Sequence, residues 1–489
     1  MIKLAELING IKVLQVAGNF QNEAVTGVEY DSRNVKKNSI FVAVKGYSVD
    51  GRKFIPDALN NGAIAVVLDQ NNIMPEELFL HNNAAKILVN NSRIALAELS
   101  GIFFNQPSEK LKLIGITGTN GKTTTAFIIK NILEFAGHKS GLMGTISNQI
   151  GDKVVKSKLT TPESLELNQL LAQMVEENCD YAVMEVSSHS LALNRVHGLN
   201  YRTAVFTNLT NEHLDFHPDF ESYLEAKKIL FDDLSEDAFA VYNSDDSSSS
   251  KMLQDCLAKK YSYGVKQSDF LIKDIEYDIN GTSFTIDYEN ETYPISTSLV
   301  GEFNAYNACA AFAVTKLNGI DDDKIINGIK NSLQVPGRFE VLVKENRKIV
   351  IDYSHTPDSL EKTLHAIHGL NRNGDEVVTI FGCGGNRDKT KRPAMGRIAA
   401  EMSDKVIITS DNPRFEDPLE IIDSIKSGIS KKNYNVIENR EEAIKNAIDN
   451  SKDHSIILIA GKGHEDYQEI KGTRLHFSDR EVANTYLNS

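Results

Sequence analysis

The stretch "LIGITGTNGKTTTAFII", residues 113 to 129, places glycines, one lysine and three threonines between two apolar runs. Glycines let the backbone curl so that successive N–H groups point inward, and such a loop favours an anion. Lys122 adds a positive charge, and Thr123 adds a hydroxyl of the kind that binds Mg²⁺. The apolar residues after Thr125 predict a helix that begins at Lys122 and directs its positive end at the same anion. The segment therefore predicts a site for the phosphates of a nucleotide.

The spacing of this loop departs from the ordinary P-loop at one position. The P-loop pattern has a glycine where this chain has Ile116, and the nearest glycine is Gly115. The departure disfavours an ordinary kinase or GTPase and favours a variant of the loop. A glycine-rich turn without a ligand is the alternative, but a strand before the Gly-Lys-Thr and a helix after it disfavour that interpretation.

Acidic residues follow two other apolar segments and could hold the metal ion that accompanies a nucleotide. "VMEVSSHS" carries Glu185, and "TNLTNEHLDFH" carries Glu212, His213, Asp215 and His217. Mg²⁺ prefers carboxylate and phosphate oxygens, so Glu185 is the first candidate ligand. A glutamate at the end of a strand is often only a surface or capping group, and the residues alone leave the role of His213 open.

The chain divides into three predicted parts, residues 1–108, 109–336 and 337–489. The first is predicted to contain the strands "SIFVAV", "AIAVVLD" and "KILVN"; the second "KLIGIT", "YAVMEV", "TAVFTNL" and "AFAVYNSD"; the third "VVTIFGCGGNRD", "KVIITSDNPR" and "SIILIAGKGHE". In open parallel sheets ligands bind outside the carboxyl ends of the strands, so an active site between the second and third parts is expected. The run "SDDSSSS", residues 244 to 250, is predicted as a solvated loop.

Composition excludes several classes of function. With 489 residues the chain is too long for one core, and 41% hydrophobic with 25% charged residues is typical of a globular protein. The formal charge of −14 argues against broad binding of nucleic acid or anionic membranes. The N-terminus lacks the pattern of a signal peptide and no long apolar run follows, so we expect a cytoplasmic protein without membrane insertion. The four cysteines are widely spaced, which predicts reduced structural thiols.

A set of ordered motifs then resembles one enzyme family. From residue 115 to 468 the chain contains "GITGTNGKTTT", "MEVSSH", "TNLTNEHLDFH", "YLEAKKILF", "GEFNAYNACAA", "PGRFE", "DYSHTPDSL", "GCGGNRDKTKRPAMG", "SDNPRFEDP" and "GKGHEDYQ". These motifs resemble the Mur ligases, and within them the group that adds the third peptide residue to UDP-N-acetylmuramoyl-L-alanyl-D-glutamate. "YDSRNVKKNSIFVAVKG" near the N-terminus is similar to that group's uridine-binding segment.

The resemblance implies an architecture and a reaction. The expected fold is α/β, with an N-terminal uridine-binding domain, a central P-loop ATPase-type domain and a C-terminal Rossmann-like domain. In this family ATP phosphorylates a carboxylate of the substrate, and an amine attacks the acyl phosphate and releases phosphate. A monomer is expected. The residues implied for ATP are Gly118, Thr119, Asn120, Gly121, Lys122, Thr123, Thr124, Asn304, Asn307, Arg338, Asp352 and His355.

The resemblance also implies metal ligands and a modified lysine. Lys122, Thr123 and Glu185 match the family's phosphate and Mg²⁺ positions, and His213 matches a second metal ligand. The family's carbamylated lysine, N6-carboxylysine, falls on Lys227. Carbamylation turns an ammonium into an anion with two oxygens, which explains how a lysine could lie beside Mg²⁺. The sequence alone would make Lys227 an ordinary solvated lysine.

Contacts to the nucleotide-sugar peptide are implied in two segments of the chain. Thr160 and Thr161 could equally be a turn in front of Pro162, and Leu193 stands where some relatives carry a polar contact. Arg195 could neutralise a diphosphate or a carboxylate. The residues matched to this substrate are Tyr30, Ser32, Lys45, Gly46, Tyr47, Thr160, Thr161, Ser187, Leu193 and Arg195.

The added amino acid is expected to be meso-diaminopimelate. "SDNPR" could be only a turn, since Asp and Asn bond their own backbone and Pro fixes φ. Family members that add diaminopimelate carry Asp-Asn-Pro-Arg here, and an arginine can grip the far carboxylate that lysine lacks. Glu465 would pair with the neighbouring ammonium. The residues implied for the amino acid are Arg387, Asp411, Asn412, Pro413, Arg414, Gly461 and Glu465.

Three alternatives stay open on the sequence. The same ligase could add L-lysine. A folylpolyglutamate ligase shares "GTNGK" and the lysine carbamate but needs neither the uridine-type first segment nor "DNPR". A nucleotide-operated binding switch would leave the polar strand ends of the third part without a role.

Overall fold

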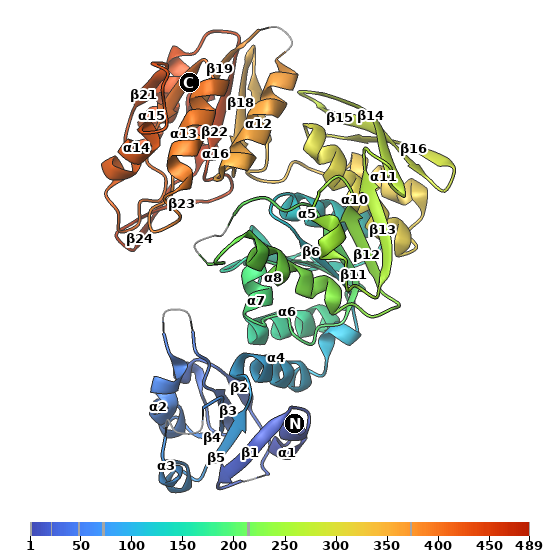
Figure 1. The fold of residues 1–489 in the computed structure, drawn as a ribbon, viewed down its shortest axis with the longest axis vertical. Helices are drawn as coiled ribbons and strands as arrows, with labels where there is room; N and C mark the ends of the chain where they lie inside the picture. The colour runs from blue at the N-terminus through green and yellow to red at the C-terminus, as the bar shows by residue number, and fades with distance from the viewer. Residues whose placement is uncertain are drawn as a thin grey trace.

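A computed structural model gives the chain as three α/β domains arranged along its long axis, with the N-terminal domain at one end and the C-terminal domain at the other (Figure 1). The structure describes residues 2–20, 22–46, 49–70, 74–212, 216–371 and 374–488. This is the three-domain architecture that the motifs imply. The borders at 108/109 and 336/337 stay a prediction.

The N-terminal domain is built on a five-stranded sheet of order β1-β5-β4-β3-β2, in which only β1 runs antiparallel to its neighbour. Its central strand β4 is buried along its whole length, because helices cover both faces. The elements are α1 (Leu4–Asn9), β1 (Val13–Gly18), β2 (Gly27–Glu29), η1 (Ser32–Asn34), β3 (Ser39–Val42), η2 (Gly51–Phe54), α2 (Ile55–Asn60), β4 (Ala63–Leu68), α3 (Glu76–His81), β5 (Ala85–Val89) and α4 (Ser92–Phe103).

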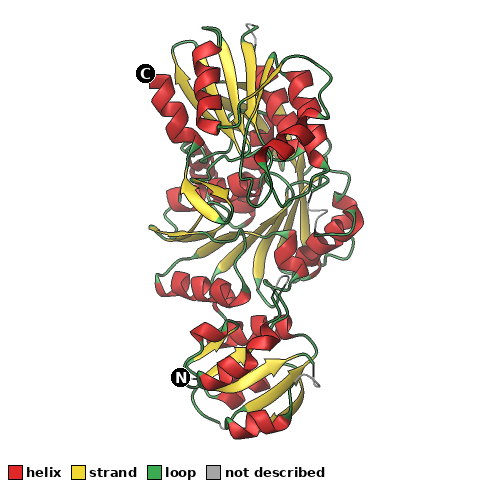
Figure 2. Cartoon of the chain, turned by 90° about the vertical axis from the view of Figure 1, so that its left-hand side faces the viewer, coloured by secondary structure: helices red, strands yellow, loops and turns green. Residues whose placement is uncertain are grey.

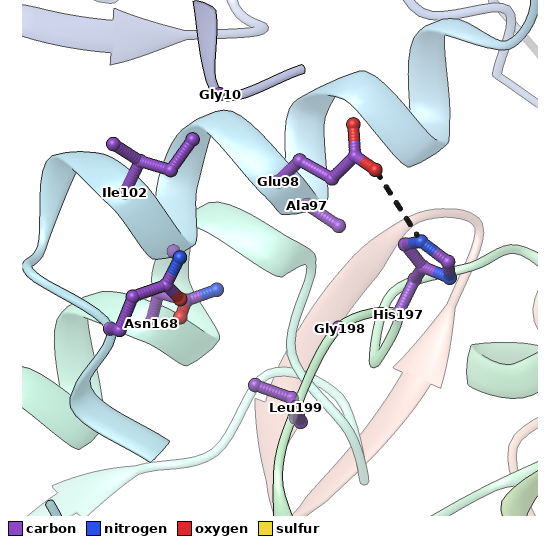
Figure 3. A pocket seen from close by; sticks show the side chains of 10 residues that line it. Gly10, Ala97, Glu98, Ile102, Asn168, His197, Gly198 and Leu199 are labelled. Carbon is purple, nitrogen blue, oxygen red and sulfur yellow. Dashed lines mark ion pairs between the residues drawn. The ribbon is translucent and has the colours of Figure 1, made fainter. Parts of the chain in front are cut away.

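Helix α4 joins this domain to the central one, because it packs against α6 (Ser164–Glu176) (Figure 1). The contact encloses a cavity of about 90 Å³ lined by both domains. At its edge His197 Nε2 lies 3.7 Å from Glu98 Oε1, as Figure 3 shows. The two domains therefore meet through side chains as well as through the connecting chain.

The central domain contains an eleven-stranded sheet of order β16-β15-β14-β13-β12-β11-β6-β10-β7-β8-β9, parallel from β14 to β7 and antiparallel beyond. Its elements are η4 (Pro107–Glu109), β6 (Lys112–Thr117), α5 (Lys122–Phe135), β7 (Ser140–Met143), β8 (Ser147–Ile150), β9 (Lys153–Lys156), α6, β10 (Tyr181–Glu185), α7 (Ser188–Ala192), β11 (Tyr201–Phe206), α8 (Phe220–Asp232), β12 (Phe239–Asn243), α9 (Ser249–Met252), β13 (Lys259–Gly264), β14 (Phe270–Asp278), β15 (Gly281–Tyr288), β16 (Glu291–Thr297), α10 (Glu302–Leu317) and α11 (Asp322–Lys330).

Alternating residues of the central strands face two different cores. Ile114, Val183 and Val205 pack with α5 and α10, whereas Leu113 and Met184 pack with α6 and α8 on the other face. Figure 2 shows these strands between helices on both sides. Strand β6 lies between β10 and β11, which follow it in the sequence, so the order of connections reverses there. Such a switch point leaves a crevice beyond the carboxyl end of the strand, where the phosphate loop lies.

The C-terminal domain has a six-stranded sheet of order β17-β18-β22-β19-β20-β21, parallel except for β17, and a separate hairpin of β23 and β24. Its elements are β17 (Glu340–Lys344), β18 (Arg347–Asp352), α12 (Pro357–Leu370), β19 (Glu376–Phe381), α13 (Lys391–Met402), β20 (Lys405–Ile408), α14 (Pro418–Lys426), β21 (Tyr434–Val436), α15 (Arg440–Asn450), β22 (Ser455–Ala460), β23 (Tyr467–Ile470), β24 (Thr473–His476) and α16 (Asp479–Asn488).

Every segment predicted as a strand contains one, whereas the prediction of a solvated loop for the serine-rich run was wrong for the last part of the run. Ser248 and Ser249 are buried, and α9 begins inside the run. Asp245 Oδ2 accepts hydrogen bonds from the Tyr306 hydroxyl at 2.9 Å and from the Val265 N–H at 2.7 Å. Carboxylates that accept such bonds order the turn over residues 244 to 248, which leads directly into α9.

A buried ion pair fixes the end of β22. The guanidinium of Arg440 donates to the two carboxylate oxygens of Asp479 at 2.7 and 2.8 Å, and also to the carbonyl of Ala460 at 2.9 Å. Both side chains of the pair are fully buried. Ala460 is the last residue of β22, so this pair determines where the chain enters the loop at Gly461.

Asp479→Ala is expected to lower the free energy of unfolding by about 3 to 5 kcal/mol, because a buried guanidinium would lose its partner. The double variant Arg440→Met, Asp479→Leu should lose much less. Urea unfolding followed by circular dichroism measures both, since the chain has no tryptophan. Glu401→Ala, which breaks the exposed pair between Arg397 and Glu401, is the control and should change little. A double variant that is as unstable as Asp479→Ala would contradict this account.

Candidate active site

The phosphate loop follows β6 and ends at the first residue of α5. Gly118 has φ of 148° and Gly121 has φ of 87°, both in the region that favours glycine. A Cβ at Gly118 would lie 1.9 Å from Thr207 Oγ1, and one at Gly121 would lie 2.5 Å from Asn307 Oδ1. Both glycines are therefore required by the backbone conformation and by the close approach of neighbouring side chains.

Lys122 folds back over this loop. Its ammonium donates to the carbonyls of Gly118 at 2.6 Å and Thr119 at 2.8 Å. Burial lowers the pKa of Lys122, against the pull of the Glu212 and Glu185 carboxylates. The carbonyls of the loop therefore hold the Lys122 amino group over the loop.

Glu185 lies at the carboxyl end of β10 with its carboxylate under the phosphate loop. Glu185 Oε2 accepts a hydrogen bond from Thr123 Oγ1 at 2.9 Å and another from Thr145 Oγ1 at 3.0 Å. Glu185 Oε1 accepts from the Thr145 N–H at 2.8 Å, and the residue is 1% exposed. Thr145 was not predicted from the sequence. Its position two residues beyond β7 could have indicated it, because β7 runs parallel to β10 and the carboxyl ends of both strands lie at the same edge of the sheet.

The oxygen atoms around Glu185 fit Mg²⁺. The threonine hydroxyls and the glutamate carboxylate are hard donors, and they lie where a triphosphate would supply further oxygens. Within the described residues no group of three His, Cys, Asp or Glu side chains gathers as a complete metal site. His213 and Tyr47, both predicted as site residues, lie outside the described residues.

Lys227 on α8 is not the solvated lysine that its sequence context suggests. It is 1% exposed, and its ammonium donates to the carbonyl of Gly118 at 3.0 Å and lies 4.8 Å from the centre of the Tyr223 ring. Among the described residues no carboxylate forms an ion pair with it. Burial, and then the neighbouring Lys122, lowers the pKa of Lys227 well below its ordinary value. A lowered pKa increases the fraction of a buried amine that is unprotonated and nucleophilic.

Residues from the third domain reach the same loop. Arg338 Nη2 donates to Thr123 Oγ1 at 3.2 Å, and its guanidinium lies 4.6 Å from the centre of the Tyr353 ring. His355 Nε2 lies 3.2 Å from Glu212 Oε1. Asn120 Nδ2 donates to Asp358 Oδ2 at 2.8 Å, a contact that the sequence did not predict. The predicted interdomain site is therefore lined by both domains.

The other residues predicted for ATP lie beside the loop or support it. Asn307 Nδ2 donates to Asn304 Oδ1 at 3.0 Å, and Thr125 Oγ1 donates to Asn307 Oδ1 at 3.3 Å, so α10 contacts α5 behind Gly121. Asp352 Oδ2 accepts from the Phe339 N–H at 2.7 Å, which places Asp352 next to the segment that carries Arg338.

The residues predicted for the nucleotide-sugar peptide lie on both sides of the first domain contact. The Tyr30 hydroxyl donates to Glu166 Oε1 at 2.7 Å across that contact, and Ser32 is buried in η1. Thr161 Oγ1 accepts from the Ser187 N–H at 3.1 Å and donates to the carbonyl of Glu185 at 2.8 Å.

The remaining residues of this group connect it to the phosphate loop. Thr160 Oγ1 lies 3.1 Å from Thr145 Oγ1. Arg195 donates to the carbonyl of Thr161 at 3.3 Å, and Leu193 caps the end of α7. The Gly46 N–H donates to the carbonyl of Val49 at 2.9 Å, which closes the loop after Lys45. The predicted substrate residues therefore form a path from the first domain to Glu185.

The residues predicted for the amino acid gather at the carboxyl ends of β20 and β22. Asn412 Nδ2 donates to Glu465 Oε2 at 2.7 Å. Lys462, fully buried, donates to that same oxygen at 3.1 Å and to Asn412 Oδ1 at 3.2 Å. Gly461 has φ of 116°, and a Cβ there would lie 2.7 Å from Asp411 Oδ2. Lys462 was not predicted from the sequence. Its ammonium forms an ion pair with Glu465, the carboxylate predicted to bind the ammonium of the amino acid.

Arg414 is held by the β23–β24 hairpin. Its N–H donates to the carbonyl of Glu469 at 3.0 Å, and its own carbonyl accepts from the Lys471 N–H at 2.7 Å. Its guanidinium donates to the carbonyl of Gly385 at 2.7 Å and lies 3.6 Å from Glu469 Oε2. The carbonyl of Pro413 abuts Gly385. Arg387 is exposed, and no hydrogen bond or ion pair among the described residues joins it to this group.

The comparisons with known proteins agree with this arrangement. Three family models match: the Mur ligase middle domain over residues 116–315, the Mur ligase, glutamate ligase domain over residues 337–463, and the Mur ligase family, catalytic domain over residues 24–104. In the part of the chain that the structure describes, no helix is both long and apolar enough to cross a membrane.

Curated relatives resemble the chain over nearly its full length. The UDP-N-acetylmuramoyl-L-alanyl-D-glutamate--2,6-diaminopimelate ligase of Clostridium tetani is 42% identical over 485 residues, covering 98% of each chain. The ligase of the same name from Bacillus cereus is 45% identical over 471 residues, covering 95% of this chain and 94% of the relative. A solved structure of a ligase of that name is 32% identical, with a TM-score of 0.70 and 98% of each chain covered.

His464, between Gly461 and the hairpin, is expected to make stability depend on pH. Burial, and then the nearby Arg338 cation, lowers the pKa of His464 to about 3 from 6.5. Between these two values the unfolded chain binds a proton that the folded protein does not, so stability falls as the pH falls, by up to about 1.4 kcal/mol per pH unit.

His464→Gln should therefore gain stability relative to the unmodified protein as the pH falls from 7.5 to 5, as measured by urea unfolding at each pH. His81→Gln, at an exposed end of α3, is the control. A constant difference between His464→Gln and the unmodified protein across this range would contradict the assignment.

Proposed function

Because this chain belongs to the Mur ligase family, we propose that it joins meso-2,6-diaminopimelate to the D-glutamate carboxylate of UDP-N-acetylmuramoyl-L-alanyl-D-glutamate at the expense of ATP. The product is a tripeptide precursor of peptidoglycan. The observation that carries this proposal is the meeting of Lys122, Glu185 and Arg338 at one phosphate loop, with cations from two domains facing one anion site.

The reaction has to bring two anions together. A carboxylate and a triphosphate repel each other, so the site must neutralise and align them before they react. Lys122 and Arg338 provide positive charge on either side of Thr123. A carboxylate oxygen then bonds to the γ-phosphorus and ADP leaves; the amine attacks the acyl carbon, loses a proton and expels phosphate.

Thr123 and Glu185 are the residues of this chain that would hold Mg²⁺, and His213 would add a ligand for a second ion. When bound, Mg²⁺ would draw off negative charge from the phosphate oxygens. Thr145 positions the buried Glu185 carboxylate with two hydrogen bonds.

Lys227 carries the carbamate in this proposal. Its neutral amine adds to CO₂, forming one N–C bond and losing one proton to solvent, and the product is an anion with two oxygens. Burial and the lowered pKa support this step, because only the unprotonated amine reacts. A protonated Lys227 would repel the neighbouring Lys122 ammonium. The carbamate replaces this repulsion by an attraction between opposite charges.

The nucleotide-sugar peptide would bind across the first domain contact. Tyr30, Ser32 and the loop of Lys45, Gly46 and Tyr47 would hold the nucleoside. Thr160, Thr161, Ser187 and Leu193 would hold the peptide, and Arg195 an anionic group of the same substrate. The bond from Thr161 to the Glu185 carbonyl supports a peptide end close to the phosphate loop.

The far end of diaminopimelate would bind at Arg414, Asn412 and Glu465. Arg414 can exchange its 3.6 Å contact with Glu469 for two parallel bonds to the substrate carboxylate. L-Lysine would instead place an ammonium beside the Arg414 guanidinium. Arg414 would therefore attract diaminopimelate and repel lysine. Because Lys462 already pairs with Glu465, the substrate ammonium would share that carboxylate.

The proposed compartment of the enzyme is the cytoplasm, and the proposed active unit is a monomer.

The first test measures phosphate release with each substrate omitted in turn. Release should require ATP, the UDP-dipeptide and diaminopimelate together. Lys122→Ala and Glu185→Ala should each abolish it while the UDP-dipeptide still binds in calorimetry, because the uridine lies in another domain. Phosphate release that needs only ATP would favour a nucleotide-operated switch, and release driven by a folate would favour a folylpolyglutamate ligase.

Arg414→Ala is expected to lose the preference for diaminopimelate over L-lysine. Removing a charged partner from a desolvated site typically costs ~3 to 5 kcal/mol, or roughly two to three and a half decades in kcat/KM. Arg414→Lys keeps the charge without the planar fork and should fall in between, and Arg397→Ala on the exposed face of α13 is the control. Equal kcat/KM values for the two amino acids in the unmodified enzyme would refute the assignment.

A further inference from the structure

Two arginines from different domains converge on one carboxylate at the contact between the N-terminal and central domains. Arg195 Nη2 lies 2.8 Å from Glu163 Oε1, and Arg93 Nη1 lies 3.6 Å from Glu163 Oε2. Arg93 belongs to the first turn of α4, where Asn91 caps the helix by accepting from the N–H of Arg93 at 2.9 Å. Glu163 directly precedes α6, and Arg195 follows α7. The sequence analysis predicted a role only for Arg195.

The three side chains are mostly buried but still reach solvent. Their exposed fractions are 16% for Arg93, 20% for Glu163 and 13% for Arg195. Two guanidinium groups share one carboxylate, so the cluster is short of negative charge. Burial lowers the pKa of Arg93, and the Arg195 cation adds to this effect against the opposing Glu163. Arg195 Nε is buried without a hydrogen-bond partner among the described residues.

The cluster lies between the two parts of the substrate path. Arg93 Nη2 donates to the carbonyl of Lys45 at 3.1 Å, in the loop proposed to hold the nucleoside. Arg195 Nη1 donates to the carbonyl of Thr161 at 3.3 Å, in the segment proposed to hold the peptide. In a nucleotide-sugar peptide the group that connects the nucleoside to the sugar and peptide is a diphosphate. The cluster therefore lies where the diphosphate of the bound substrate is expected, between the nucleoside and the peptide.

We propose that Arg93 and Arg195 together bind the diphosphate of the nucleotide-sugar substrate, and that Glu163 takes the place of this diphosphate when no substrate is bound. The inference rests on the proposed function, which it deepens by assigning Arg93 and Glu163. Arg93 donates from the first domain and Arg195 from the central one, so the diphosphate bridges the two domains as Glu163 does in its absence.

A permanent structural salt bridge would need different geometry. A carboxylate that is kept for stability should bind both guanidinium groups tightly, since burying charges is repaid only by close hydrogen bonds. The Arg93 distance of 3.6 Å is longer than a hydrogen bond, and the two guanidinium groups share a single carboxylate. A diphosphate supplies more oxygens and more charge than a single carboxylate, and arginine forks match its geometry.

The test compares ligands that differ only in the diphosphate. Uridine and UDP are titrated into the unmodified protein and Arg93→Ala by ligand-observed NMR, which detects weak binding. UDP should bind the unmodified protein more tightly than uridine does. In Arg93→Ala the affinity for UDP should fall on the order of 10- to 100-fold while that for uridine is unchanged. Arg93→Lys should lose part of this affinity, and Arg202→Ala, at an exposed position near the amino end of β11, should lose none.

A purely structural role for Arg93 predicts a different result. Equal losses for uridine and UDP in Arg93→Ala and Arg93→Lys, or no loss for either ligand, would overturn the proposal. Glu163→Gln removes the competing charge and should bind UDP several-fold more tightly than the unmodified protein; unchanged or weaker binding would overturn the role of Glu163.

The two hypotheses fail in different ways. If UDP binding depends on Arg93 but the unmodified protein does not ligate the UDP-dipeptide to diaminopimelate, the proposed function fails and the diphosphate site stands. If ligation proceeds but Arg93→Ala keeps both its affinity for UDP and its KM for the UDP-dipeptide, the site fails and the function stands.

Discussion

The carboxylate of Glu185, held by Thr123 and Thr145 under the phosphate loop, is the interaction on which the rest of the site depends. A buried carboxylate is costly unless it accepts several hydrogen bonds, and here three donors supply them, one from the first turn of α5 and two from Thr145 after β7. Because β6, β7 and β10 run parallel, their carboxyl ends deliver these donors to one edge of the sheet. The bond from Thr161 to the Glu185 carbonyl then ties the proposed peptide segment to that edge.

Around this anchor the chain distributes positive charge among three domains. Arg93 lies in the first, Arg195 and Lys122 in the second, and Arg338 and Arg414 in the third, although the formal charge of the whole chain is −14. Each cation contacts a carbonyl, a hydroxyl or a carboxylate of the protein, such as Glu163 or Glu469, that a substrate anion can replace. Since the proposed reaction joins anionic substrates, this distribution explains why the site spans three domains.

The sequence predicted the strands, the phosphate loop and the clusters at the strand ends, because these follow from local apolar runs and glycine spacing. It did not predict Thr145, Glu163 or Lys462, since each contacts a residue far away in the chain: Glu185, Arg195 and Asn412, respectively. Lys227 illustrates the same limit: its neighbours in sequence suggest a solvated helix, and only the packing of α8 against the loop buries it. Composition also does not reveal that the serine-rich run is ordered by the bonds of Asp245 and ends in buried residues at α9.

The central claim is that this protein makes an amide bond through an acyl phosphate. It is tested most directly by labelling the D-glutamate carboxylate of the UDP-dipeptide with ¹⁸O and analysing the released phosphate by mass spectrometry. Because a carboxylate oxygen attacks the γ-phosphorus and leaves with it, each phosphate should carry one ¹⁸O atom when ATP and diaminopimelate are present. Tripeptide formed with unlabelled phosphate would contradict the account.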